Sequence, residues 1–343
     1  MRWIAHGMVL NEEAFCRSSI LSIYNFVDEI VLVEGSTQYA YSANAYGLSS
    51  DRTAEIIRSI PDPGHKIRFY QVGWVSTKRE LRSMSLKMCT YKPDTCLLVL
   101  DLDEVWDPHD LQRADEAFSQ DPKLQYLHCE LIQLRGDFEH YRDMSTGEQE
   151  HALYNEQAQK QPIHTRTGVT LRQGRTAERL FRWSYGMYYV SHTCICDVHG
   201  RYPYIDPGYL EGREWRPDIK FWHYNYLKPF PQVFLKFCYF AQQDGGTKRN
   251  DPQMIERALG EGYVKYLLTG EKTPGDWAVT NLPDTLHHPE IMRAHSLYGL
   301  SQQTISDPHR EWDPRTVTPE RMLRLAEQES RWVGPDLRHL VAS

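Results

Sequence analysis

A short acidic run follows one of the most apolar segments of the chain. Residues 96–100 (CLLVL) lead directly into Asp101-Leu102-Asp103-Glu104. If the chain stays extended here, the spacing of two places the carboxylates of Asp101 and Asp103 on one face. Two hard oxygen donors in such a place suit Mg²⁺ or Mn²⁺, which usually keep several waters and bind substrate phosphates as well. The alternative interpretation is that these acids only cap the helix that follows.

A second enzyme class uses a similar motif. LLVLDLDEV also fits the opening motif of haloacid-dehalogenase-like phosphatases, in which Asp101 would be the nucleophile and Asp103 a proton donor. That class needs a catalytic Lys and further acids downstream, but the acidic segment 136–143 (GDFEHYRD) has the wrong internal spacing. The motif also normally opens its domain, whereas three strand–helix units precede it here. The phosphatase is therefore kept as the alternative enzyme class.

The elements before the acidic run alternate between strand and helix patterns. Apolar runs predict strands over residues 4–10, 29–35, 66–72 and 96–100. Capping residues predict the starts of four helices at Asn11, at Ser50 or Asp51, at Thr77 and at Asp107. This rhythm is typical of right-handed βαβ units. It predicts an α/β fold with a mainly parallel sheet flanked by helices, whose ligands bind beyond the carboxyl ends of the strands.

The pattern is less regular in the second half of the chain. A strand is expected over residues 126–134, then a long polar loop over about 140–175. Two aromatic segments, RLFRWSYGMYYVSHTCICDV and IKFWHYNYL, also predict strands. Helical patterns dominate after Gly245. We therefore predict a first domain over residues 1–245 and a helical C-terminal extension over residues 246–343.

The composition excludes several classes of protein. The 343 residues are 41% hydrophobic and 25% charged, which is ordinary for a globular protein and excludes a disordered or collagen-like chain. A net charge of −7 provides no global positive field for nucleic acid or anionic lipid. The seven cysteines have no repeated spacing, which favours reduced thiols. No segment approaches the ~20 apolar residues of a membrane span, and the N-terminus has no signal-peptide pattern. These features predict a cytoplasmic protein and leave peripheral attachment to the inner face of a membrane open.

Five segments over about the first 100 residues share their order with a known family. They read MVLNEEAF, DEIVLVEGST, SDRTAEII, KRELRSMSLKMC and LLVLDLDEVW. Together they resemble the inverting family-2 glycosyltransferases of GT-A fold, especially the bacterial branch with a strand ending in D-x-D-E. RLFRW and FWHYNY extend the resemblance to about residue 230. The chain departs from the family at Glu34, where Asp is usual, at Glu80, where Asn is usual, and by an insertion over residues 38–50.

The resemblance implies a GT-A catalytic domain with a nucleotide-sugar half over about residues 1–110 and an acceptor half over about 111–245. The residues implied to bind the donor follow the early strands and the RLFR segment: Asn11, Glu34, Gly35, Ser36, Asp51, Arg79, Asp101, Arg179 and Arg182. It implies that Asp101 and Asp103 hold Mn²⁺ or Mg²⁺, with His223 as a third ligand. For His223, a buried histidine making one hydrogen bond is an equally good interpretation.

The catalytic base is not fixed by the resemblance. The family branch often has His-Glu after its Arg-Leu-Phe-Arg strand, but here His192 is followed by Thr193. His192, Asp197 and Glu104 are the three candidate bases. If none of them serves, a retaining mechanism becomes conceivable.

A zinc site is an alternative use of the segment around His192. His192, Cys194, Cys196 and His199 are of ligating types, but Cys-x-Cys differs from the usual Cys-x₂₋₄-Cys spacing. Buried free thiols in a strand are the favoured interpretation.

The sequence as a whole predicts a metal-dependent enzyme. It would transfer a sugar from a UDP-, GDP- or dTDP-sugar to a hydroxyl of a carbohydrate, lipid-linked or other acceptor, by direct displacement with inversion. No nucleic acid is expected as a partner. The main non-catalytic alternative is a carbohydrate-binding scaffold of the same fold, which Glu34 and the missing His-Glu pair suggest.

Overall fold

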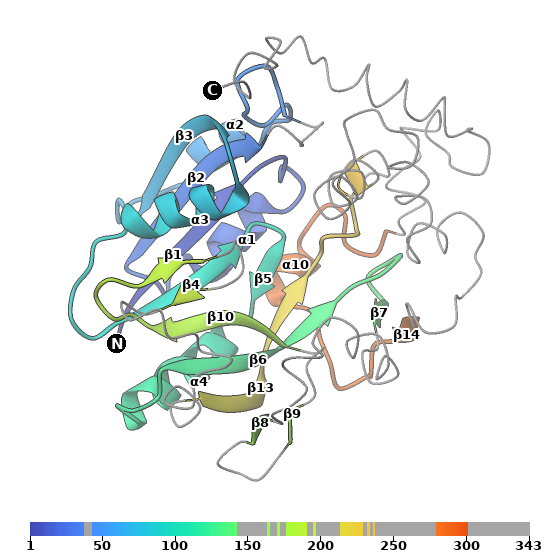
Figure 1. The fold of residues 1–343 in the computed structure, drawn as a ribbon. Helices are drawn as coiled ribbons and strands as arrows, with labels where there is room; N and C mark the ends of the chain where they lie inside the picture. Colours follow the sequence, from blue (N-terminus) through green and yellow to red (C-terminus); the bar gives the residue numbers. More distant parts are fainter. Residues whose placement is uncertain are drawn as a thin grey trace.

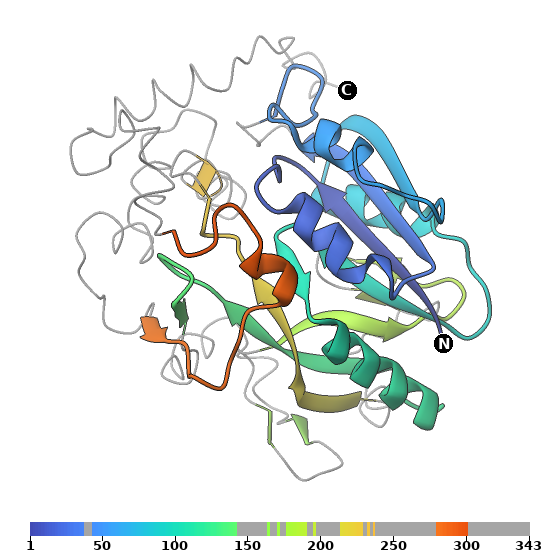
Figure 2. The same ribbon diagram turned by 180° about the vertical axis from the view of Figure 1, so that it is seen from behind.

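The fold is a single large sheet with helices on both faces (Figures 1 and 2). The structure is a computed structural model. It describes residues 1–37, 43–142, 163–164, 170–171, 176–190, 195–196, 213–228, 232–233, 236 and 279–300. Eight strands pair in the order β3-β2-β1-β4-β10-β6-β13-β5. Their bounds are β1 Arg2–Val9, β2 Glu29–Thr37, β3 Ile67–Val75, β4 Thr95–Asp101, β5 Glu104–Trp106, β6 Tyr126–Gln133, β10 Thr176–Arg182 and β13 Arg213–His223.

The sheet is parallel in its first half and mixed in its second. β3, β2, β1 and β4 pair in parallel, as their βαβ pattern predicts. β10 runs antiparallel to both β4 and β6, β13 runs parallel to β6, and β5 runs antiparallel to β13. The α/β class is thus confirmed, while the sheet is mixed rather than mainly parallel beyond β4. Because β10 is antiparallel to both of its neighbours, β6 runs in the same direction as β4, and so does β13. The carboxyl ends of β6 and β13 therefore lie on the same side of the sheet as those of β1, β2 and β4.

Alternate side chains of the strands point to opposite faces of the sheet, and each face carries its own hydrophobic layer. Helices α1 (Cys16–Tyr24), α2 (Thr53–Arg58) and α4 (Pro108–Gln120) pack on one face, where Trp3, Leu98 and Leu100 are buried (Figure 2). Helix α3 (Lys78–Lys87) covers the other face over β1 and β2 and packs Leu86 against Leu97 (Figure 1). Both faces of β4 are therefore covered, which is why its sequence is continuously apolar.

Local capping signals form as the sequence predicts. The side chain of Thr77 accepts from the Glu80 amide at 3.2 Å, and the Glu80 carboxylate accepts from the Ser76 amide at 3.0 Å, so α3 begins with reciprocal capping bonds. Asp107 accepts from the His109 amide at 2.8 Å, with Pro108 in the first turn of α4.

The predicted cap at Asn11 is wrong. Asn11 has a φ of +53° and α1 begins only at Cys16, so Asn11 does not lead into a helix. Asparagine is one of the few residues that tolerate this left-handed conformation. Its side-chain oxygen instead accepts from the amide of Ser50 at 2.8 Å. Asn11 thus ties the β1–α1 turn to the loop before α2.

The chain from residue 279 to 300 packs against the N-terminal core. It contains β14 (Val279–Asn281), which pairs with β7 (His140–Arg142), and α10 (Glu290–Arg293). Met292 is buried in one cluster with Phe15 and Tyr224. The predicted boundary near residue 245 and the rest of the predicted helical extension lie outside the described residues and stay predictions. Two further pairs of two-residue strands complete the named elements: β8 (Ile163–His164) with β9 (Thr170–Leu171), and β11 (Tyr188–Tyr189) with β12 (Ile195–Cys196).

Gly7 allows the close approach of β1 to β4 beside the acidic run. A Cβ atom at Gly7 would lie 2.4 Å from the backbone oxygen of Leu100. We expect Gly7→Ala to lower the free energy of unfolding by about 1–3 kcal/mol, because β1 or β4 must shift. Urea unfolding monitored by circular dichroism measures the change. Gly64→Ala is the control, since Gly64 is exposed and a Cβ there first meets the flexible side chain of Lys66, at 3.2 Å. Equal stabilities of the two variants would contradict the prediction.

Candidate active site at the carboxyl edge of the sheet

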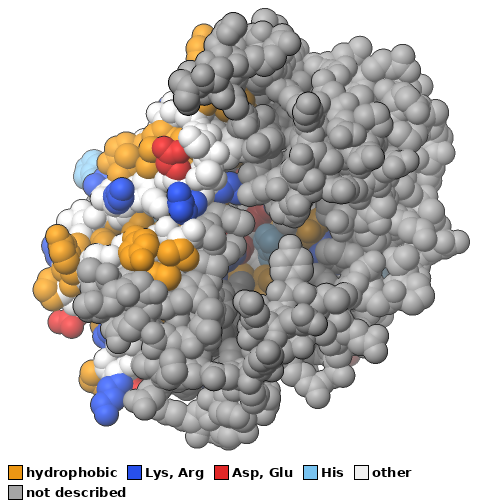
Figure 3. Space-filling view, in the orientation of Figure 1, with side chains coloured by type: hydrophobic (Ala, Val, Ile, Leu, Met, Phe, Trp, Pro, Cys, Tyr) orange, Lys and Arg blue, Asp and Glu red, His pale blue; other side chains and the backbone are white. Residues whose placement is uncertain are grey.

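The carboxyl ends of several strands bring polar residues together at one edge of the sheet. β4 ends at Asp101, β6 ends at Gln133 and β13 ends at His223, while β5 begins there with Glu104. Open α/β sheets bind ligands beyond the carboxyl ends of their strands. Figure 3 shows a hollow on this side of the molecule in which acidic, histidine and basic side chains are visible. This edge is the candidate site.

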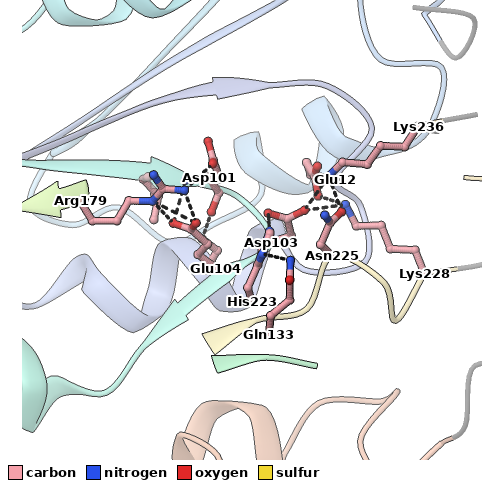
Figure 4. A network of polar contacts seen from close by, with 12 residues as sticks. Glu12, Asp101, Asp103, Glu104, Gln133, Arg179, His223, Asn225, Lys228 and Lys236 are labelled. Carbon is pink, nitrogen blue, oxygen red and sulfur yellow. Dashed lines mark hydrogen bonds and ion pairs between the residues drawn. The ribbon is translucent and has the colours of Figure 1, made fainter. Parts of the chain in front are cut away.

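The first group of charges at this edge centres on Asp101. Arg82 Nη2 donates to Asp101 Oδ1 at 2.6 Å, and Arg179 Nη2 donates to Asp101 Oδ2 at 2.9 Å. Arg179 also binds Glu104, with its Nε 2.8 Å from Oε2 and its Nη2 2.5 Å from Oε1 (Figure 4). Arg179 therefore bridges two acids of the run, and we call Asp101, Glu104, Arg82 and Arg179 the arginine cluster.

Burial and pairing act in opposite directions on the acids of the arginine cluster. Burial alone would raise the pKa of Asp101, but the attraction of Arg82 and Arg179 outweighs it and lowers the pKa below its ordinary value. For Glu104, whose side chain is 1% exposed, burial dominates and raises the pKa although Arg179 opposes it. Arg179 is thus the main group that opposes the effect of burial on the pKa of Glu104.

The second group of charges centres on Asp103, whose side chain is 2% exposed. His223 Nε2 lies 3.2 Å from Asp103 Oδ1. Lys228 Nζ lies 3.2 Å and Lys236 Nζ 3.6 Å from Asp103 Oδ2. Lys228 Nζ also donates to the carboxylate of Glu12, which reaches in from the β1–α1 turn (Figure 4). We call these five residues the lysine cluster.

Charge pairing in the lysine cluster shifts the pKa values of its two acids in opposite directions. Burial would raise the pKa of Asp103, but Lys228, Lys236 and His223 lower it well below the ordinary value. Burial and the nearby Asp103 charge raise the pKa of Glu12 to about 8 against the opposing effect of Lys228. Burial would lower the pKa of Lys228, yet Glu12 and Asp103 raise it above its usual range. Lys228 is therefore an ammonium held between two carboxyl groups.

The prediction that Asp101 and Asp103 share one face of an extended strand is wrong. β4 ends at Asp101, and the chain turns through Leu102 and Asp103 before β5 starts. Leu102 is buried in the core and anchors this turn. The two carboxylates consequently enter different clusters, with arginines around Asp101 and lysines around Asp103 (Figure 4).

His223 makes hydrogen bonds with both of its ring nitrogens. Arg135 Nη2 donates to Gln133 Oε1 at 2.9 Å, which turns the Nε2 amide of Gln133 toward His223 Nδ1 at 3.2 Å. Nδ1 therefore accepts this bond, and the ring proton on Nε2 points to Asp103. Both nitrogens that a metal ion could use are engaged.

The residues predicted to hold Mn²⁺ or Mg²⁺ do not fit that ion in this arrangement. Both oxygens of Asp101 pair with arginines, and Asp103 is surrounded by two ammonium groups and an imidazole N–H. Among the residues that the structure describes, no three His, Cys, Asp or Glu side chains are grouped so that they could bind a metal ion. A divalent cation at Asp103 would have to displace a lysine.

The donor-site residues predicted around β2 are close together but internal. Glu34 is fully buried; it accepts from the Ser49 amide at 2.9 Å and from Gln71 Nε2 at 2.6 Å. Ser36 is buried next to it, and a Cβ at Gly35 would lie 2.6 Å from the oxygen of Gly73. Glu34 therefore fastens the loop before α2 onto the sheet.

Asp51 is hydrogen-bonded to the β1–α1 turn, whereas Arg79 is separate from both. The carboxylate of Asp51 accepts from the amides of Thr53 at 2.9 Å and Glu13 at 3.2 Å, and burial raises its pKa. Asn11 binds the same loop through Ser50. Arg79 is exposed in the first turn of α3.

Arg182 does not fit its predicted role in donor binding. Its guanidinium donates to the backbone oxygens of Leu124 at 2.8 Å and Phe118 at 2.6 Å, near the C-terminus of α4. Arg182 also pairs with Cys96 at the start of β4, opposite the end that carries Asp101. The antiparallel direction of β10 explains why Arg179 and Arg182 serve opposite edges of the sheet.

Two of the three candidate bases, His192 and Asp197, lie outside the described residues. Three of the four residues of the zinc alternative, His192, Cys194 and His199, also lie outside them. Cys196 is buried and is not part of a disulfide. Glu104, the third candidate base, is held by Arg179. No helix in the described part of the chain is long and apolar enough to cross a membrane.

Four charged residues of the site were not among those predicted from the sequence: Glu12, Arg82, Lys228 and Lys236. Arg82 had a usable signal, because it lies one helical turn after Arg79 on the face of α3 that carries the buried Ser85 and Leu86. Glu12 follows Asn11, where a helix start is predicted, but α1 begins only at Cys16, four residues after Glu12.

Comparisons with known proteins add a distant likeness. No protein-family model and no curated protein matches the chain. Crystal structures of S. aureus TarS are similar to it. TarS 1–349 aligns at 10% identity over 76% of this chain and 70% of that one, with a TM-score of 0.38. The same segment in complex with UDP aligns at 11% identity over 80% and 74%, with a TM-score of 0.38. The longer TarS structure aligns at 11% identity over 80% of this chain and 45% of that one, with a TM-score of 0.37.

Proposed function

We propose that the protein transfers a glycosyl group from a nucleoside-diphosphate sugar to a hydroxyl acceptor at the carboxyl edge of its sheet. The observation that carries this proposal is the acidic turn from Asp101 to Glu104 at the end of β4, in which arginines hold Asp101 and Glu104. Open parallel sheets bind nucleotides at this edge. The motif order in the sequence adds support, because it resembles that of the family-2 glycosyltransferases of GT-A fold.

In this proposal the donor lies between the acidic turn and the loops after β1 and β2. Asn11 and Asp51 belong to the joined loops that border the donor, and Arg79 lies at the start of α3. Glu34 acts as a positioning residue, because its carboxylate is fully buried and bound to Ser49 and Gln71.

The proposed reaction is a direct displacement. The acceptor oxygen forms a bond to the anomeric carbon while the bond from that carbon to the diphosphate oxygen breaks, and the diphosphate leaves with the electron pair. The acceptor proton passes to a base, a transfer that typically contributes 10²–10⁴-fold to the rate. His192 and Asp197 are the proposed bases. Glu104 is better placed to hold Arg179 than to take the proton of an acceptor hydroxyl, because its side chain is 1% exposed.

The test is a panel of UDP-, GDP- and dTDP-sugars in which release of the nucleoside diphosphate is measured, with and without Mn²⁺ or Mg²⁺. We expect one nucleotide series to be turned over and Asp101→Asn to lower kcat by about 100-fold or more, because the arginine cluster loses its central charge. Glu55→Gln, at a side chain that is 72% exposed on α2, is the control and should leave kcat unchanged.

Two other results would contradict the proposed transfer. Release of phosphate from p-nitrophenyl phosphate, lost in Asp101→Asn, would identify the phosphatase alternative instead. Binding of nucleotide sugars or oligosaccharides without turnover under any of these conditions would identify a scaffold.

A further inference from the structure

We propose that Lys228 and Lys236 take the place of a divalent cation in this site and neutralise the diphosphate of the donor. This inference rests on the proposed function and specifies how its leaving group is held. The expected Mn²⁺ or Mg²⁺ does not fit the donor set, whereas two ammonium groups already lie at the carboxylate assigned to that ion.

Lys228 lies between two carboxyl groups that come from different turns of the chain. Its Nζ contacts Glu12 from the β1–α1 turn and Asp103 from the β4–β5 turn. The side chain of Lys228 is 5% exposed, and those of Glu12 and Asp103 are 14% and 2% exposed. A buried ammonium is tolerated only when it is paired in this way. Removing Lys228 would leave two buried acids facing each other.

Lys236 is the lysine that can reach a ligand. Its side chain is 31% exposed, so it borders solvent, while Asp103 and the side-chain oxygen of Asn225 orient its ammonium (Figure 4). Lysine is a common phosphate ligand because its ammonium is a compact charge with three donors. A diphosphate placed beside Asp103 would therefore meet Lys236 first, with the charge of Lys228 behind it.

Two ammonium groups and the Nε2 of His223 already surround Asp103, and Lys228 also contacts Glu12. A divalent cation added to this arrangement would lie next to two ammonium groups, and like charges at such distances repel strongly in a buried site. The positive charge that a diphosphate leaving group needs is instead supplied by side chains that are held before the ligand arrives, which avoids reorganisation during the reaction.

Isothermal titration calorimetry tests this proposal. The probes are inorganic pyrophosphate, UDP, GDP and dTDP, each titrated in EDTA and again with Mn²⁺, and Mn²⁺ alone. We expect pyrophosphate and at least one nucleotide to bind with Kd values that agree within about threefold in the two conditions. We expect Lys236→Met to weaken binding by about 10- to 100-fold and Lys236→Arg to retain most of it.

The experiment also includes a control variant at another lysine and a variant that is expected to gain metal binding. Lys220→Met is the control, because Lys220 is 27% exposed on β13 and pairs with Glu130 away from Asp103. It should leave binding unchanged. Mn²⁺ alone should give no heat with the natural protein. The double variant Lys228→Met/Lys236→Met should bind it, since Glu12 and Asp103 are then without ammonium partners. If this double variant does not fold, the affinity of Lys236→Met and the comparison of binding in EDTA and in Mn²⁺ still test the proposal.

The outcomes separate the two proposals. Nucleotide binding that requires Mn²⁺, or Mn²⁺ binding to the natural protein that Asp103→Asn abolishes, would overturn the lysine proposal and leave glycosyl transfer standing. Absence of binding by pyrophosphate and all three nucleotides in both conditions would overturn both proposals.

Discussion

Replacing Arg179 with methionine is expected to lower the free energy of unfolding by about 3–5 kcal/mol. Arg179 pairs with Glu104, whose side chain is 1% exposed, and also with Asp101. The substitution leaves the buried Glu104 carboxylate without its guanidinium partner, and an uncompensated buried charge is far more costly than a lost surface pair. Urea or guanidinium unfolding, followed by circular dichroism, measures the loss.

The double variant Arg179→Met/Glu104→Gln separates this cause from lost packing. With no charge left at residue 104, we expect the double variant to regain most of the stability that the single variant loses. The loss in Arg179→Met should also be smaller at pH 5 than at pH 8. Burial already raises the pKa of Glu104, and a carboxyl group with a raised pKa in the folded state destabilises the fold as pH rises. A double variant that is less stable than the single variant would show that Arg179 acts mainly through packing.

The second large effect concerns His6, a fully buried histidine in the centre of β1. Ser85 donates to the backbone oxygen of Arg82 at 2.8 Å, so its hydroxyl accepts from His6 Nδ1 at 2.9 Å. His6 Nε2 then accepts from the hydroxyl of Tyr189 at 3.2 Å. These bonds are satisfied by an uncharged ring. Burial and the nearby charge of Arg82 lower the pKa of His6 from 6.5 to about 3, with Asp101 opposing.

We therefore expect the protein to lose stability as pH falls below about 6.5. Between pH 6.5 and about 3 the unfolded chain binds a proton at His6 that the folded chain does not bind. Over that window, His6 should lower the free energy of unfolding by about 1.4 kcal/mol per pH unit. His6→Gln, whose amide can still donate to Ser85 and accept from Tyr189, should lack this contribution. Urea unfolding of both proteins at intervals from pH 7 to 4 measures the two slopes; parallel lines would contradict the prediction.

The parts of the fold that the sequence predicted are those set by neighbouring residues. Asp107-Pro108 starts a helix because capping needs only the next few amides, and the apolar run before Asp101 becomes β4 because it is buried on both faces. The βαβ order likewise predicted the parallel strands of the first half. The mixed second half was not predictable in this way, because strand direction there depends on pairing between segments far apart in the chain.

The candidate site was predicted in its location but not in its partners. The pattern placed Asp101 and Asp103 at a strand end, which is correct, but a two-residue spacing gives a shared face only while the chain stays extended. Burial of Leu102 bends the chain, and that depends on the packed core. Lys228 lies 125 residues after Asp103 in the sequence, so no local pattern connects the two. Glu34 was expected at the ligand, but Ser49 and Gln71 bury it.

The place of β10 in the sheet has a consequence for synthesis. β10 lies beside β4, yet it is completed roughly 80 residues later. At about 5–20 residues per second, the first four strands wait roughly 4–16 s on the ribosome before the leucine-rich edge of β4 receives its neighbour. Such an edge readily recruits another nascent chain. A holding chaperone that shields β4 over this interval would thus protect the polypeptide at its most vulnerable stage of production.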